Sequence, residues 1–157
     1  IKAILANHKN EKGIIHCHTY KIANYLKRHL RSTRIIAHDS TNREEMLKKH
    51  INSNKPTVLL SPSMTEGVDL KGDLSRFQII CKVPYTYLGD PIIRKRMAKN
   101  KKWYPMKTAI SIVQAFGRSV RSKDDKAITY ILDSDWTKFT MKNKSVFPKE
   151  FLDCIVK

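Results

Sequence analysis

Side chains that could bind phosphate are concentrated at residues 114–121, where the sequence reads QAFGRSVR. The spacing of apolar residues predicts a helix over residues 108–122, which would place Gln114, Arg118 and Arg121 at positions i, i+4 and i+7 of one face. The apolar residues fall on the opposite face, so this helix would bury one side in a core. A guanidinium is always charged, and its planar fork of donors suits the oxygens of a phosphate.

The surroundings of these arginines leave two interpretations open. Gly117 is predicted on the polar side of the helix, where glycine lowers helix stability but lets another group approach closely. The same pattern could be a solvated basic face, which is the commoner explanation for an arbitrary pair of arginines. The residues alone therefore indicate phosphate chemistry without excluding the simpler interpretation.

Composition restricts the class of protein. The chain has 157 residues, of which 41% are hydrophobic, enough for one globular domain with its own core. We predict a single domain over residues 1–157, in which residues 136–157 form a helical tail. The 31 Lys and Arg residues outnumber 14 acidic residues and give a formal net charge of +17, which favours a polyanionic partner, and nucleic acid first.

Other classes are disfavoured by features that the sequence lacks. It shows no basic amphipathic helix with an aromatic face, no apolar run of membrane-spanning length and no signal peptide, so we predict no membrane partner. The three cysteines are far apart, which predicts no disulfide and a reducing location, cytoplasmic or nucleoid-associated. The histidines do not repeat with ligand spacing, so no metal site is predicted. Because Ile1 stands where Met would, we expect a fragment of a longer protein.

The order of apolar segments predicts the fold. Each predicted strand is apolar throughout instead of alternating, as in parallel sheets that are covered on both faces. We therefore predict an α/β fold, a doubly wound and mainly parallel sheet with helices on both faces. Cys17 and Cys81 would be small hydrophobic residues of its core. The predicted strands are residues 13–18, 34–38, 57–61, 77–83 and 127–133.

Polar residues follow several of these strands. In sheets of this kind, ligand groups lie on the loops at the carboxyl ends of the strands. Hydroxyl and backbone N–H groups can contact phosphates there, Lys and Arg add salt-dependent attraction, and aromatic rings can stack on unpaired bases. Ordinary turn chemistry and aromatic packing are the alternative explanation for each loop taken singly. The predicted nucleic-acid-binding residues are His18, Thr19, Tyr20, Lys21, Ser61, Ser63, Tyr87 and Arg94.

Four segments in order carry a family resemblance that covers about residues 10–135. The pattern Q-x-x-G-R-x-x-R at residues 114–121 resembles motif VI of superfamily 2 helicases. SMTEGVDL at residues 63–70 is similar to motif V, with the E-G-x-D core of the XPD/DinG branch. VPYTYLGDP at residues 83–91 resembles a segment of the same branch, and GIIHCHTY at residues 13–20 resembles motif IV. One such segment could arise by chance, whereas four in order indicate a relationship.

The resemblance implies the second RecA-like motor domain of an XPD/DinG-like DNA helicase. It implies that Arg121 is the arginine finger, Arg118 a second phosphate ligand and Gln114 a positioning group in ATP hydrolysis. An arginine aimed at the transferred phosphoryl group is commonly worth about 10³–10⁵ in rate. The resemblance also implies that three motif V residues couple the nucleotide to the DNA groove: Glu66, Gly67 and Asp69.

The chain also lacks parts of the helicase pattern. It has no G-x-x-x-x-G-K-[ST] segment and no Asp-Glu-x-His box, so ATP and Mg²⁺ would be held mainly by an N-terminal RecA-like domain that is absent here. An iron–sulfur cluster, as many XPD-like proteins carry, could belong only to that absent part. We predict that this chain alone does not hydrolyse ATP. Its expected partners are single-stranded DNA and the N-terminal motor domain.

Alternative functions remain open on the sequence. A non-catalytic module that grips single-stranded nucleic acid through its charge is the alternative from another class. Half of an RNA helicase is a third, because backbone contacts do not distinguish the sugar without a 2′-OH contact. Translocation from 5′ to 3′ rests on the resemblance only, and DNA repair, replication and transcription are equally open.

Overall fold

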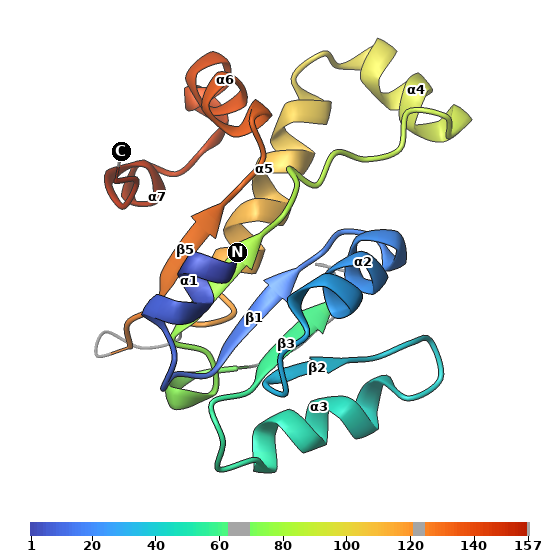
Figure 1. Cartoon of the computed structure of the whole chain (residues 1–157). Helices are drawn as coiled ribbons and strands as arrows, with labels where there is room; N and C mark the ends of the chain where they lie inside the picture. Colours follow the sequence, from blue (N-terminus) through green and yellow to red (C-terminus); the bar gives the residue numbers. More distant parts are fainter. Residues whose placement is uncertain (63–69, 121–124, 157) are drawn as a thin grey trace.

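A computed structural model describes residues 1–62, 70–120 and 125–156 (Figure 1). Its centre is a five-stranded parallel sheet with the strand order β2-β3-β1-β4-β5, which confirms the predicted doubly wound α/β fold. The strands are β1 (Gly13–His16), β2 (Ile35–Ala37), β3 (Val58–Ser61), β4 (Phe77–Ile80) and β5 (Ile128–Ile131). The helices of the described residues are α1 (Lys2–Asn7), α2 (Tyr20–Leu30), α3 (Arg43–Asn52), α4 (Pro91–Lys99), α5 (Trp103–Phe116), α6 (Asp135–Lys142) and α7 (Lys149–Asp153), with short 3₁₀ turns at Gly72–Leu74 and Lys144–Val146.

The three inner strands explain the absence of alternation in the sequence. Every residue of β1, β3 and β4 is buried, because helices cover both faces of the sheet. β1 lies at the centre, with Gly13 paired to Val58 on one side and to Phe77 on the other. The outer strand β5 is only partly covered, and Ile128 is exposed.

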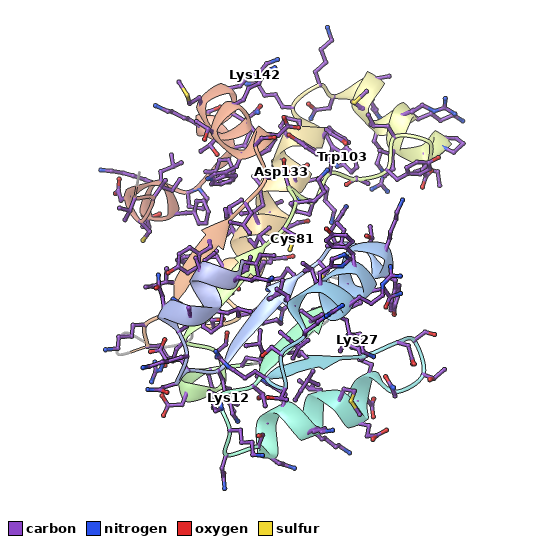
Figure 2. The ribbon with its side chains drawn as sticks, viewed as in Figure 1. Lys12, Lys27, Cys81, Trp103, Asp133 and Lys142 are labelled. Atoms are coloured by element: carbon purple, nitrogen blue, oxygen red, sulfur yellow. The ribbon has the colours of Figure 1, made fainter. Side chains whose placement is uncertain are left out.

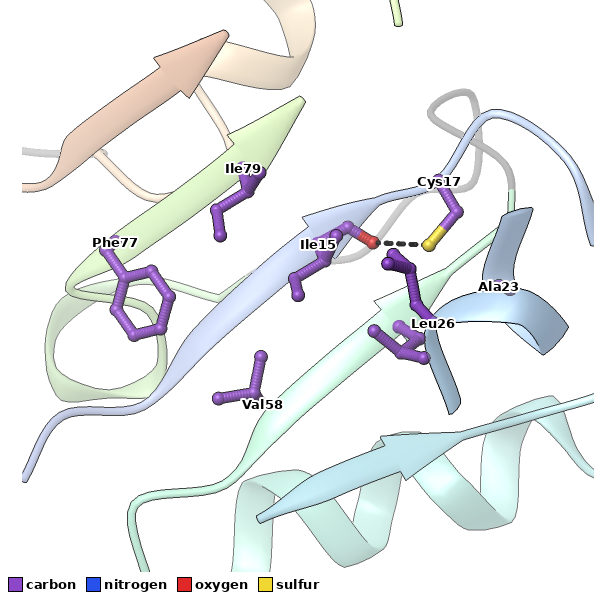
Figure 3. Close-up of a cluster of buried hydrophobic side chains, with 8 residues drawn as sticks. Ile15, Cys17, Ala23, Leu26, Val58, Phe77 and Ile79 are labelled. Atoms are coloured by element: carbon purple, nitrogen blue, oxygen red, sulfur yellow. Dashed lines mark hydrogen bonds between the residues drawn. The ribbon is translucent and has the colours of Figure 1, made fainter. Parts of the chain in front are cut away.

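Helices α1 and α2 cover one face of the sheet, in front of it in Figure 1. Ala23 and Leu26 of α2 pack on side chains of β1, β3 and β4 in a continuous apolar cluster (Figure 3). Cys17 belongs to this cluster, and its thiol donates to the Ile15 carbonyl at 3.5 Å. Cys17 is therefore the small buried residue that we predicted, and Cys81 is half-buried beside the same cluster.

Helices α3 and α5 cover the opposite face. Met46 and Leu47 of α3 pack against Ile14 and Leu59, and Ala115 of α5 packs against Ile80. α5 lies behind β4 and β5 in Figure 1 and descends toward the amino ends of the strands. The last residues of α5 therefore lie against the sheet, which matters for the site.

The C-terminal segment is helical and shares a core with α5. Phe139, Phe147 and Phe151 pack against Ala109 and Ile112 of α5. The rings of Phe147 and Phe151 stack with their centroids 5.3 Å apart. The segment predicted as a tail over residues 136–157 thus helps to hold α5 in place through these phenylalanines.

Candidate functional site

The arginine segment does not form the helical face that the sequence predicts. α5 ends at Phe116, and Gly117, Arg118 and Ser119 form the turn that follows it. Gln114 lies on the last turn of α5 and is exposed, as predicted. Arg118 lies in this turn and is half-buried. Because the helix ends at Phe116, the prediction of a helix over residues 108–122 is wrong from Gly117 onward. Arg121 lies outside the described residues.

A side chain of the sheet accounts for the end of the helix. The last carbonyl groups of a helix lack partners within the helix and need others. The Phe116 carbonyl accepts a hydrogen bond from Nε2 of Gln78, on β4, at 3.1 Å. The backbone N–H groups of Gly117 and Arg118 close the helix on Val113 and Ala115, at 3.0 and 3.1 Å.

Gly117 has a different environment from the one predicted. Its φ of −69° is open to any residue, so the turn does not require glycine for its backbone conformation. A Cβ at this position would meet only the Val113 and Gln114 carbonyls among the described residues, at 3.6 and 3.8 Å, which are ordinary contacts. No close approach of another group to Gly117 occurs within the described part of the chain.

The turn is also anchored beyond Arg118. Oγ of Ser119 donates to Oγ of Ser75 at 2.8 Å, and Ser75 donates in turn to the Phe77 carbonyl at 3.1 Å. Both serines are fully buried. The backbone N–H of Leu70 donates to the Arg118 carbonyl at 3.4 Å. Arg118 is thus held between anchors on both sides of it in the chain.

Gln78 is the centre of a buried polar network. It is 0% exposed, and its Nε2 donates both to the Phe116 carbonyl and to Oγ1 of Thr129, at 2.9 Å. Because a carbonyl can only accept, the orientation of the amide is determined, and its Oε1 faces Nε2 of His16 at 3.2 Å. His16 must therefore carry its proton on Nε2. Its Nδ1 is buried and has no hydrogen-bond partner in the described ranges.

The charge of Arg118 affects the protonation of His16. The pKa of His16 is lowered to about 4, first because the residue is buried and also because of the positive charge of Arg118, while the hydrogen bond to Gln78 acts in the opposite direction. His16 is thus neutral at physiological pH. Nε of Arg118 is buried and also lacks a hydrogen-bond partner among the residues described. A guanidinium with an unused N–H donor beside a neutral histidine is suited to bind an anion.

The predicted residues after β1 lie together at the carboxyl end of the sheet. His18 has a φ of 67°, an uncommon conformation for this residue type, which turns the chain into α2. Thr19 caps α2 by accepting from the Ile22 N–H at 3.2 Å. Tyr20 and Lys21 are exposed. Burial lowers the pKa of His18, and Lys82 lowers it further, whereas Asp133 raises it.

The segment after β4 supplies the other predicted residues at this end (Figure 1). Tyr87 is 80% exposed, and Gly89 lies directly against its ring, so a side chain at position 89 would collide with it. Asp90 caps α4 by accepting from the Ile92 N–H at 2.7 Å. α4 buries none of its residues, and Arg94 is exposed on it. The guanidinium of Arg96 on the same helix lies over the ring of Trp103, 5.5 Å from its centroid, and Trp103 is labelled in Figure 2.

The residues predicted at the end of β3 and in the loop after it are described only in part. Ser61 ends β3 and is 2% exposed, so it is a buried residue of the sheet rather than a surface group. The other predicted members lie outside the described residues: Ser63, Glu66, Gly67 and Asp69. Leu70, which follows them, reaches the Arg118 carbonyl, so this end of the segment lies beside the arginine turn.

The sequence patterns do not single out Gln78, Ser75 or Ser119, and they place His16 only among the histidines without ligand spacing and in the segment that resembles motif IV. The sequence did contain a signal for His16 and Gln78. His16 and Gln78 are polar residues within strands that are otherwise apolar, GIIH and FQII. A polar side chain in a buried strand needs a hydrogen-bond partner, which predicts a network.

Two other kinds of site are not found in the described ranges. These residues include no group of three or more His, Cys, Asp or Glu side chains placed to hold a metal ion. None of the helices in the same ranges has both the length and the apolar character needed to cross a membrane.

The sequence matches the family model described as Helicase C-terminal domain over residues 3–152. It is 26% identical over 108 residues to the ATP-dependent DNA helicase YoaA of Escherichia coli, covering 64% of this chain and 17% of YoaA. It is 28% identical over 119 residues to the ATP-dependent DNA helicase DinG of Photobacterium profundum, covering 63% of this chain and 16% of DinG. The chain spans less than a fifth of the length of these relatives.

Solved structures share the fold. An apo XPD structure matches with a TM-score of 0.74 at 20% identity, over 98% of this chain and 33% of that one. Xpd4 of S. tokodaii matches with a TM-score of 0.65 at 21% identity, over 95% of this chain and 32% of that one. The C-terminal domain of the DEAD-box protein Dbp5 matches with a TM-score of 0.60 at 15% identity, over 98% of this chain and 77% of that one. At these identities the likeness concerns the fold.

Proposed function

Because the chain belongs to the helicase C-terminal domain family, we propose that it is the second motor domain of an ATP-dependent DNA helicase similar to XPD and DinG. In this proposal it contributes residues to an ATP site that it shares with an N-terminal RecA-like domain of a longer protein. Closing and opening of the cleft between the two domains would move them along single-stranded DNA, from 5′ to 3′.

The anchored turn after α5 is the observation that supports this proposal most directly. It holds Arg118 by its backbone and leaves the buried Nε–H without a hydrogen-bond partner in the described part of the chain. An arginine whose backbone is anchored and whose Nε–H is unused is suited to bind a phosphate oxygen. Arg118 would bind the terminal phosphate of ATP, Arg121 would stabilise the charge that develops on the transferred phosphoryl group, and Gln114 would orient the reacting groups.

The DNA strand would cross the carboxyl end of the sheet. Lys21 and Arg94 are exposed there and would attract the phosphates, and Tyr20 and Tyr87 would stack on unpaired bases. His18 and Thr19, at the start of α2, would contact the DNA backbone. Ser63 would be a further contact, and Ser61, which is buried, would support the loop that follows it. Glu66, Gly67 and Asp69 would couple this surface to the nucleotide, because Leu70 at the end of their segment contacts the arginine turn.

The nucleotide and its metal would be held mainly by the other domain. The described residues of this chain bring together no set of metal ligands, whereas Arg118 provides an unused donor for an anion. Mg²⁺ would neutralise phosphate charge at the shared site, and an iron–sulfur cluster could belong only to the N-terminal part. The 157-residue chain alone is expected to show no ATP hydrolysis.

The test is DNA-stimulated ATP hydrolysis by the longer protein that contains this domain, wild type beside Arg121→Ala. We expect hydrolysis that requires single-stranded DNA and falls by about 10³-fold or more in the variant, because the arginine finger acts on the transition state. Affinity for single-stranded DNA should stay within about twofold of wild type. Hydrolysis at the wild-type rate in Arg121→Ala would contradict the proposed role.

The high positive charge supports one alternative, a module that only grips single-stranded nucleic acid. In that case Arg121 would be an ordinary phosphate contact. Arg121→Ala would then weaken DNA binding and lower its salt dependence, with no DNA-dependent hydrolysis to lose. The same pair of proteins therefore separates the two functions.

A further inference from the structure

We propose that Gln78 and Ser75 are positioning residues that hold the Arg118 turn in the geometry needed for ATP hydrolysis. This inference rests on the proposed function, since it concerns how the arginine segment is held. Neither residue belongs to the segments that carry the helicase resemblance. Both lie on or just before β4, a strand at the interior of the sheet.

The two residues hold the turn at points that flank Arg118. Gln78 binds the carbonyl of Phe116, two residues before Arg118, at 3.1 Å. Ser75 accepts from Oγ of Ser119, the residue after Arg118, at 2.8 Å. With the Phe116 carbonyl and the Ser119 side chain both bound, the backbone that carries Arg118 has little freedom to shift along the sheet.

The anchors themselves are rigid. Gln78 uses the oxygen and both N–H groups of its amide, toward His16, Thr129 and Phe116, so its side chain is bound to β1, β5 and α5 at once. Ser75 donates to the Phe77 carbonyl and is fully buried. Because all the hydrogen-bonding groups of the Gln78 amide are used, an alternative orientation of this amide would leave a buried group without a partner.

An amide in the middle of a buried strand also needs an explanation beyond packing. The neighbours of Gln78 on β4 are apolar, and an apolar residue there would fill the same volume without any need for partners. What an apolar residue cannot do is bind the last carbonyl of α5 and so determine where the helix ends. The end of α5 sets the start of the turn and therefore the position of the guanidinium. Catalytic groups must be held within about 0.5 Å of the productive geometry.

The experiment measures DNA-stimulated ATP hydrolysis by the longer protein in Gln78→Met, Ser75→Ala and Arg118→Lys, and in each of the first two combined with Arg118→Lys. Gln78→Met and Ser75→Ala should each lower kcat about tenfold or more, with the KM for ATP and the affinity for single-stranded DNA within about twofold of wild type. Neither should lower kcat further when Arg118 is already Lys, because both act through that side chain.

Ser111→Ala is the matched control. It removes a side-chain hydrogen bond on the same helix, from Oγ of Ser111 to the Lys107 carbonyl at 3.2 Å, and leaves both anchors of the turn in place, so kcat should stay near the wild-type value. Full multiplication of the losses in the double variants, or an unchanged kcat in folded Gln78→Met and Ser75→Ala, would overturn the positioning role. If Gln78→Met does not fold, Ser75→Ala and its double variant decide by the same criteria.

Arg118→Lys separates this inference from the function on which it rests. A wild-type kcat in Arg118→Lys contradicts both the role of Arg118 and the positioning of it. A reduced kcat in Arg118→Lys, together with wild-type values in the folded Gln78 and Ser75 variants, leaves the proposed function intact and contradicts the positioning role alone.

Discussion

His16 shows what burial does to a single titratable residue in this fold. It ends the central strand, is fully buried, and donates from Nε2 to Gln78, while Nδ1 has no hydrogen-bond partner among the described residues. Protonation would place a second positive charge beside Arg118 in a buried region, so the neutral form is strongly favoured. The residue therefore acts as a fixed hydrogen-bond donor and is unsuited to acid–base chemistry near pH 7.

This state predicts a pH dependence of the stability of the 157-residue chain. The pKa of His16 is about 4 in the folded protein and about 6.5 when unfolded, so the unfolded state binds more protons between these values. The free energy of unfolding should therefore fall by about 3 kcal/mol from this residue as pH drops from about 6.5 to about 4. Urea unfolding at several pH values measures this.

The comparison for that prediction is His16→Gln, which keeps an N–H donor but cannot titrate. The variant should lose the part of the pH slope that belongs to position 16. His50 also has a lowered pKa, caused first by burial, and its own contribution should remain in both proteins. An equal slope in wild type and variant would show that His16 titrates normally.

At the scale of elements, the neighbouring strands β1 and β4 pack closely at their first residues, where β1 carries a glycine. Gly13 starts β1 beside Phe77, which starts β4, and the Phe77 ring lies over the glycine. A Cβ on Gly13 would approach ring atoms of Phe77 to 2.5 Å. Phe77 is 0% exposed, and the His8 ring stacks on it with the ring centroids 4.4 Å apart, so a shift of the Phe77 ring would disturb other core contacts.

We expect Gly13→Ala to lower the free energy of unfolding by about 1–3 kcal/mol, because the added methyl group overpacks the core. Gly117→Ala is the matched control. Its φ is allowed for alanine and its Cβ would make ordinary contacts in the described part of the chain, so the change should stay within about 0.5 kcal/mol. Chemical denaturation of both variants measures the difference, and equal effects would contradict the packing argument.

At the scale of the whole molecule, net charge and fold contribute to DNA binding in different ways. A formal net charge of +17 attracts any polyanion, whatever its sequence. The fold places Lys21 and Arg94 at the carboxyl end of the sheet, and it places Lys49, in the last turn of α3, toward the start of β3. Only the first two therefore lie on the proposed path of the DNA.

This placement predicts which charges matter for binding of single-stranded DNA by the longer protein. Arg94→Ala and Lys21→Ala should each weaken binding and reduce the slope of log affinity against log salt by about 0.7. Lys49→Ala, which removes the same charge from an exposed site elsewhere, should leave that slope unchanged. Salt titrations monitored by fluorescence anisotropy measure this, and equal slopes for the three variants would indicate diffuse attraction without a defined path.

The amino-acid sequence by itself determined the doubly wound fold, because apolar strands and helical periodicity are local patterns that a parallel sheet requires. Four local segments likewise sufficed to indicate the helicase family, which the match over residues 3–152 then showed. Tertiary structure alone decided where α5 ends. The carbonyl of Phe116 is bound by Gln78, which lies 38 residues earlier in the chain, and no pattern around residue 116 contains that contact. For the same reason the position of Arg118 and the neutral state of His16 could not be predicted, since both depend on groups brought together from β1, β4 and α5.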